Sequence, residues 1–173
     1  PFPISSQKKL AGDFMKTLGF DFNHGRLDES LHPFCGGTND DVRITTRYDE
    51  ADFTSAMMGV LHETGHALYD MGLPKKYRGQ PVGDARGMSI HESQSLLMEM
   101  QACRSPEFIR FAAPLMSAAF NGGGDANGDE WSVENMTGVY TQVEKGFIRV
   151  DADEVTYPAH VILRYQLEKA AIN

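Results

Sequence analysis

The sequence predicts a mainly α-helical fold with a small β element next to its most distinctive helix. Three observations support this fold class. Apolar residues recur at helical spacing in six segments, one short segment alternates polar and apolar residues, and Gly or Pro separates the segments. A length of 173 residues fits one domain that buries its own hydrophobic core.

The first predicted helix spans residues 5–18, where three apolar residues share one face and Gly19 ends the helix. Residues 20–38 are rich in Gly, Asn and Asp and predict a loop. The segment 41–48 follows, and its alternating apolar residues predict a half-buried strand.

The remaining segments are predicted from the same signals. The further helices are expected at 52–69, 89–103, 106–120 and 132–145, and from Pro158 onward. Residues 147–150 look extended, and the glycine-rich stretch 121–129 predicts a turn. An EF-hand calcium loop is excluded there, because counting from Asp125 puts Glu130 and Met136 at the sixth and twelfth positions.

Composition excludes several classes of partner. The chain carries 16 Lys and Arg against 24 Asp and Glu, a formal net charge of −8, and it lacks the basic patch that nucleic acids require. No apolar stretch is long enough to predict a membrane span, and the start of the sequence has no signal-peptide pattern. The two cysteines, Cys35 and Cys103, are expected to be free thiols in a reducing cytoplasm.

The segment His62-Glu63-Thr64-Gly65-His66 is the strongest local signal. On a helix, its two histidines lie one turn apart on one face and can bind one metal ion. Zinc lowers the pKa of a bound water, and Glu63 can accept the proton of that water. Chance occurrence on a solvated surface is the alternative. The apolar surroundings of the segment indicate a buried helix instead, in which these polar side chains need partners.

A catalytic site of this type needs a third ligand. Glu92, at the start of the next predicted helix, is the best candidate. Ser89 and Glu92 also fit a capping box, in which the carboxylate would bond to the helix backbone. His91 is an alternative ligand, and spacing alone does not decide between His91 and Glu92. Glu99 is a weaker candidate and fits a position behind the ligands better.

Five motifs in order resemble the carboxypeptidase Taq family of zinc metallocarboxypeptidases. The matching segments are His32-Pro33-Phe34 (HPF), Asp41-Val42-Arg43-Ile44-Thr45 (DxRxT), His62 to His66 (HExxH), His91-Glu92-Ser93-Gln94 (HES/GQ) and Ile148-Arg149-Val150-Asp151-Ala152-Asp153 (IRxxAD). Each motif is weak alone, whereas five in the same order are specific.

The resemblance implies a zincin-type helical metallopeptidase core with one Zn²⁺ per chain, for which Co²⁺ or Mn²⁺ could substitute. His62, His66 and Glu92 would be the metal ligands, and Glu63 the general base. The family's enzymes release single C-terminal residues from peptides with broad specificity. They are largely helical cytoplasmic proteins and usually homodimers.

The resemblance also implies that residues 1–173 form a single metal-binding core, a fragment of a longer helical enzyme. The family's sixth motif, GxxQDxHW, has no match here. Two rival functions remain. One is a zinc oligopeptidase or dipeptidase with the same ligands, and the other is a metal-binding fragment that lacks activity because the cleft is incomplete.

Four further residues are candidates for binding substrate. An exopeptidase needs a cation for the terminal carboxylate, and Arg149 and Arg43 are the candidates. The alternative for both is a structural ion pair, for Arg43 with a nearby aspartate. Tyr157 and His160 are candidates for the donor that stabilises the developing oxyanion.

Overall fold

Helix α2 (Phe53–Gly72), which carries His62 and His66, lies between two apolar clusters. The computed structural model describes residues 1–121 and 128–173, so most of the predicted turn at 121–129 lies outside the described residues. One cluster joins α2 to helix α1 (Ile4–Leu18) and the sheet. The other joins α2 to α1, α4 (Pro106–Phe120) and α5 (Val133–Tyr140). The predicted burial of this helix is therefore confirmed.

The β element is a three-stranded sheet with the order β1-β3-β2. Strand β3 (Asp41–Thr46) pairs in parallel with β1 (Gly25–Glu29) and antiparallel with β2 (Phe34–Thr38). The alternation predicted for β3 is confirmed, because Val42, Ile44 and Thr46 are buried and face the core. The strand ends at Thr46, two residues earlier than predicted.

The helix termini follow the local signals. Gly19 ends α1 in the left-handed conformation, with φ at 102°, which glycine adopts without steric cost. The Asp52 carboxylate caps α2 by accepting a hydrogen bond from the Thr54 N–H at 2.8 Å. Pro158 lies in the first turn of α6 (Tyr157–Ile172), as predicted.

Three local predictions are wrong. The loop expected at 20–38 contains β1 and β2, whose exposed residues lack alternation and are held in strands by backbone pairing with β3. The helix expected at 132–145 is shorter than predicted, because α5 ends at Tyr140. The segment expected to be extended at 147–150 instead leads into a 3₁₀ turn at Arg149–Asp151. Further 3₁₀ turns lie at Lys75–Tyr77, Pro81–Gly83 and Asp129–Trp131.

The helix expected at 89–103 has a change of geometry in its second half. Helix α3 (Met88–Leu96) passes into a π-helical segment, η3 (Leu97–Ala102). Single π turns within helices occur often at functional sites. Glu99 lies in this segment.

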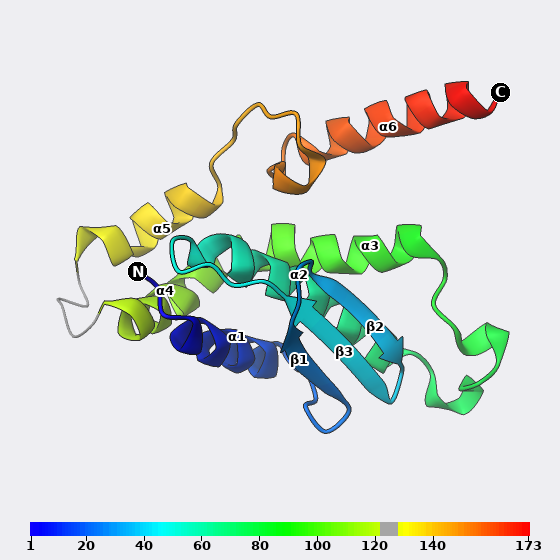
Figure 1. The fold of residues 1–173 in the computed structure, drawn as a ribbon, viewed down its shortest axis with the longest axis horizontal. Helices are drawn as coiled ribbons and strands as arrows, with labels where there is room; N and C mark the ends of the chain where they lie inside the picture. The colour runs from blue at the N-terminus through cyan, green and yellow to red at the C-terminus, as the bar shows by residue number, and fades with distance from the viewer. Residues whose placement is uncertain (122–127) are drawn as a thin grey trace.

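Helix α6 lies apart from the sheet and α1 (Figure 1), and none of its residues is buried. Its exposed apolar side chains are Val161, Ile162, Leu163, Tyr165, Leu167 and Ile172. Within residues 1–121 and 128–173, no helix combines the length and the apolar character needed to cross a membrane.

Cys35 and Cys103 are both free thiols, as predicted. Burial, with a smaller contribution from nearby carboxylates, raises the pKa of each thiol to about 12. The thiolate is the reactive form of cysteine. Both cysteines therefore act as packing residues in the folded chain.

The folded chain should react slowly with a thiol reagent at pH 8. Relative to a thiol at the ordinary pKa of 9.0, the thiolate fraction of each cysteine falls roughly a thousandfold. Ellman's reagent should label two thiols per chain at once in denaturant and neither at a comparable rate in buffer. A rapid phase of one thiol per folded chain would contradict the protonated state of the half-buried Cys35.

Candidate metal centre

Three side chains from α2 and α3 converge on one point. His62 and His66 lie one turn apart on α2, and Glu92 lies on α3. His62 Nε2 is 3.8 Å from Glu92 Oε1, and His66 Nε2 is 3.4 Å from Glu92 Oε2. One donor atom from each residue lies within 4.8 Å of the other two. Two imidazoles and one carboxylate in this arrangement could hold a metal ion of the zinc class.

Gly65 permits the close approach of the two helices. A Cβ atom at this position would lie 2.6 Å from Ser95 Cα and 2.7 Å from the Gln94 carbonyl oxygen. Both of these atoms belong to the backbone of α3, which therefore passes directly over the α2 backbone. Ser95 is fully buried at this crossing. Because Gly65 lies between the two histidines, the crossing brings Glu92 to both of them.

The capping-box alternative for Glu92 is wrong. The residue that caps the start of α3 is Gly87, and it makes no side-chain cap hydrogen bond. The Glu92 carboxylate contacts the two imidazoles instead of the helix backbone at Ser89.

The outward-facing nitrogens of both imidazoles have their own partners. His62 Nδ1 is 2.8 Å from Glu99 Oε2, and His66 Nδ1 is 2.7 Å from His91 Nδ1. His91 therefore contacts the opposite side of the His66 ring from Glu92, and it is not part of the converging group. Outer partners of this kind orient metal-ligating histidines, so that the remaining nitrogen faces the metal.

Glu99 links the site to the helices behind it. Its second oxygen accepts a hydrogen bond from Arg104 Nη2 at 2.9 Å, and Arg104 Nη1 donates to the Tyr140 carbonyl at 3.2 Å. The sequence indicated that Glu99 lies behind the metal ligands. Its contacts with His62 and Arg104 agree with that position. The sequence analysis missed Arg104, and no local pattern marks it.

Electrostatics favour a negatively charged Glu92. Its contact with His66, with added contributions from His62 and Tyr157, lowers the pKa of Glu92 to about 2 despite its partial burial. Burial lowers the pKa of His62, but the hydrogen bond and charge of Glu99 outweigh this effect, and the net shift is upward. Glu92 is therefore available as an anionic ligand throughout the neutral pH range.

Glu63 has a different environment from Glu92. Its side chain is buried, and burial raises the pKa of its carboxyl group. Within the described residues, no hydrogen bond or ion pair engages the Glu63 carboxylate. Its nearest charged neighbours include His62, His66 and Glu92, which places this carboxylate beside the converging group. An unengaged carboxylate of raised pKa is suited to accepting a proton.

Two of the four predicted substrate residues reach the site. Tyr157 Oη donates to Glu92 Oε1 at 3.1 Å and accepts from Arg149 Nη1 at 2.8 Å. The Arg149 guanidinium also lies 5.7 Å from the centre of the Tyr157 ring. Burial and the charge of Glu92 raise the pKa of Tyr157, which keeps its hydroxyl protonated.

The other two substrate candidates do not contact the converging group. Arg43 forms an ion pair with Asp41 at 2.7 Å on the exposed face of β3. This is the structural ion pair that the sequence offered as the alternative to substrate binding. His160 lies one turn after Tyr157 on α6. Within the described residues, the His160 side chain makes no hydrogen bond or ion pair.

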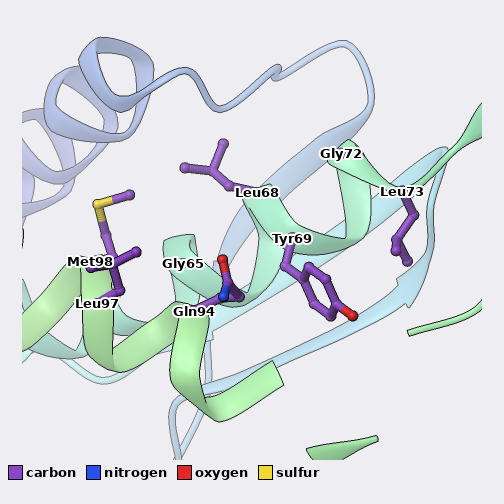
Figure 2. A pocket seen from close by; sticks show the side chains of 8 residues that line it. All are labelled: Gly65, Leu68, Tyr69, Gly72, Leu73, Gln94, Leu97 and Met98. Atoms are coloured by element: carbon purple, nitrogen blue, oxygen red, sulfur yellow. The ribbon is translucent and has the colours of Figure 1, made fainter. Parts of the chain in front are cut away.

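A hollow of about 260 Å³ lies between α2 and the α3–η3 segment (Figure 2). Its walls are Gly65, Leu68, Tyr69, Gly72, Leu73, Gln94, Leu97 and Met98. None of the three converging residues lines it, so this hollow is separate from the candidate metal centre.

The profile of the carboxypeptidase Taq (M32) metallopeptidase family matches residues 1–173. The chain belongs to this family. It is 41% identical to carboxypeptidase 1 of Bacillus subtilis and 42% identical to thermostable carboxypeptidase 1 of Thermus thermophilus, over 98% of its own length in each case. The predicted family resemblance is confirmed.

Solved structures of family members share this fold. The chain superposes on metallocarboxypeptidase 1 of Trypanosoma cruzi with a TM-score of 0.89 at 46% identity. With the M32 carboxypeptidase of Deinococcus radiodurans the TM-score is 0.81 at 36% identity. The predicted fold class, a helical metallopeptidase core with a small sheet, is therefore confirmed. The chain spans about a third of the length of these relatives.

Gly65→Ala should destabilise the chain, because its new Cβ meets the α3 backbone. We expect the free energy of unfolding, measured with urea, to fall by about 1–3 kcal/mol. Gly72→Ala in the same helix is the matched control, since no atom lies within 4 Å of its added Cβ. This control should be neutral or more stable by up to ~1 kcal/mol. Equal stability of the two variants would contradict the close helix crossing.

Proposed function

We propose that the chain is the metal-binding core of a zinc-dependent metallocarboxypeptidase that releases single C-terminal residues from peptides with broad specificity. The observation that carries this proposal is the convergence of His62, His66 and Glu92 within 4.8 Å, with both outward ring nitrogens already engaged. Membership of a metallopeptidase family supports it.

Two imidazoles and one carboxylate match the three protein ligands of catalytic zinc sites, and similar ligands accept cobalt or manganese. A zinc ion bound by these residues would polarise the scissile carbonyl and lower the pKa of water. Glu92 contributes the negative charge of the ligand set, since its pKa of about 2 keeps it ionised.

Glu63 acts as the general base in the proposed reaction. It follows His62 directly on α2 and is buried beside the ligands, with no competing hydrogen bond within the described residues. Its carboxylate accepts a proton from the attacking water and then passes this proton to the nitrogen of the leaving amine. Burial, which raises the pKa of Glu63, improves its ability to hold the proton between these two steps.

Arg149 and Tyr157 are the proposed substrate-binding residues nearest to the ligands. The hydroxyl of Tyr157 lies against Glu92 and can donate to an oxygen that develops negative charge beside the metal. Arg149 contacts Tyr157 and offers a planar cation for the terminal carboxylate of a peptide. His160 and Arg43 remain secondary candidates, because neither contacts the ligand set.

The proposal includes three statements about the whole protein. Residues 1–173 act as one metal-binding core, and the enzyme is a homodimer and works in the cytoplasm. The exposed apolar side chains of α6 supply surface for association, and the two free thiols suit a reducing compartment.

Metal analysis of the purified chain tests the ligand set. We expect about one zinc per chain after incubation with zinc and dialysis. Glu92→Gln should weaken binding by more than the roughly 10–100-fold that loss of an outer partner causes. Glu168→Gln, an exposed glutamate on α6, is the control and should bind as the wild type does. A wild-type chain without zinc, or an unchanged Glu92→Gln, would overturn the metal site.

Glu63→Gln tests the general base separately from the metal site. This variant should retain zinc, because Glu63 is not a ligand, and its kcat for peptide hydrolysis should fall about 10²–10⁴-fold. Amino-acid analysis of peptide digests measures the release of single C-terminal residues. Internal cuts would contradict the carboxypeptidase assignment. A wild-type chain that binds zinc and releases nothing would support a metal-binding core that needs further parts of the cleft.

A further inference from the structure

The segment between α5 and α6, residues 141–156, brings Arg149 to the edge of the candidate metal centre with little support from packing. Ala152 is the one residue of this segment that is buried. The larger apolar side chains of the segment are more than half exposed, namely Val143, Phe147, Ile148, Val150 and Val155. Hydrogen bonds must therefore hold this segment in place, because burial of apolar surface contributes little.

The Asp153 carboxylate accepts three hydrogen bonds from the backbone of this segment. Its Oδ2 accepts from the Glu144 N–H at 2.9 Å. Its Oδ1 accepts from the Val155 N–H at 2.9 Å and from the Thr156 N–H at 2.8 Å. The Asp153 backbone carbonyl also accepts from the Tyr157 N–H at 2.9 Å. This one residue thus ties the start of the segment to the turn from which α6 begins.

The two side chains that extend toward the metal ligands lie on either side of Asp153 in the sequence. Arg149 lies inside the loop that the Glu144–Asp153 contact closes, and Tyr157 follows Asp153 at the start of α6. Arg149 Nη1 donates to Tyr157 Oη at 2.8 Å, and Tyr157 Oη donates to Glu92 Oε1 at 3.1 Å. These contacts join two turns of the chain, so they depend on how the two turns are held together.

We propose that Asp153 is a positioning residue, whose carboxylate fixes the placement of Arg149 and Tyr157 beside the metal site. It thereby sets the preference of the site for a peptide with a free terminal carboxylate. This inference rests on the proposed function, in which Arg149 and Tyr157 bind substrate. The hydrogen bonds of the Asp153 carboxylate go to backbone N–H groups, and within the described residues none of them reaches a candidate metal ligand.

A carboxylate is the group that this arrangement requires. Its two oxygens carry no hydrogen, so they can accept N–H groups from two directions, and a charged acceptor forms a stronger hydrogen bond. In Asp153→Asn, the amide oxygen can keep the contacts with Val155 and Thr156. The NH₂ group is a donor, so it cannot accept from the Glu144 N–H. Asp153→Ala loses all three contacts, and the two variants therefore remove the contacts in two steps.

Asp151→Asn is the matched control, because it removes the same charge from the same segment. Asp151 is exposed, and within the described residues its side chain makes no hydrogen bond or ion pair. Circular dichroism and the unfolding midpoint show whether each variant folds. If Asp153→Ala does not fold, Asp153→Asn and the wild type decide the outcome.

Amide hydrogen exchange in the metal-free chain, followed by NMR, tests the three backbone contacts. In the wild type, the amides of Glu144, Val155 and Thr156 should exchange at least about tenfold more slowly than free amides. Asp153→Asn should speed exchange at Glu144 alone, and Asp153→Ala should speed exchange at all three. Unprotected amides at all three positions of the wild type would overturn the proposal.

The ring resonances of Tyr157 report its placement without any catalytic readout. They can be assigned by their loss in Tyr157→Phe, and they are sensitive to the Arg149 guanidinium, which lies 5.7 Å from the ring centre. These resonances should shift in both Asp153 variants and stay unchanged in Asp151→Asn. Unchanged Tyr157 resonances in a folded Asp153→Ala chain would contradict the positioning role.

Peptide binding to the zinc-loaded chain tests the consequence for substrate choice. The probes are one fluorescent peptide with a free C-terminal carboxylate and the same peptide as its C-terminal amide. All variants carry Glu63→Gln, so that the peptide is not consumed. We expect Asp153→Ala to lower the preference for the free acid about tenfold, with unchanged zinc content, and Asp153→Asn to lower it less. A merely structural loss would weaken the binding of both peptides equally.

These outcomes separate the inference from the proposed function. A wild-type preference for the free acid that persists in Asp153→Ala would overturn the positioning role and leave the proposed function standing. A wild-type chain that binds no zinc, or does not prefer the free acid, would overturn the proposed function. Hydrogen exchange and the Tyr157 resonances would then still decide whether Asp153 places Arg149 and Tyr157.

Discussion

The crossing of α2 and α3 at Gly65 is the contact on which the candidate site depends. Helices approach no closer than the side chains at their crossing permit. With only hydrogen on Gly65, the α3 backbone lies directly against α2, and Glu92 reaches both His62 and His66. A larger side chain would displace the third donor from the other two. The spacing of three atoms within 4.8 Å therefore follows from one small residue.

Burial of α2 explains why so many polar groups accompany this crossing. The helix lies between two apolar clusters, and unpaired polar groups there are costly. Each imidazole accordingly has a partner on its outward nitrogen, Glu99 for His62 and His91 for His66. These partners leave both Nε2 atoms directed at Glu92. Glu63 differs because no hydrogen bond or ion pair engages its carboxylate within the described residues, and this difference suits the general-base role that we propose for it.

The site draws on three segments that are distant in sequence. Helix α2 supplies two imidazoles and Glu63, the α3–η3 segment supplies Glu92, His91 and Glu99, and the region around α6 supplies Arg149 and Tyr157. Helix α6 joins the site only through its first turn, and its remaining length is exposed and rich in apolar residues. The curated relatives are about three times as long as this chain.

Local periodicity in the sequence determined most helices, strand β3 and the pairing of His62 with His66, because one helical turn fixes the separation of residues four apart. Resemblance to the family selected Glu92 over His91, which spacing could not do. Strands β1 and β2, the end of α5 and the π turn were decided by tertiary structure, since exposed edge strands depend on backbone pairing with β3. The contacts of His91 with His66 and of Arg104 with Glu99 also came only from the fold. Hydrogen bonds between side chains on different helices depend on how those helices pack, and no local pattern encodes that packing.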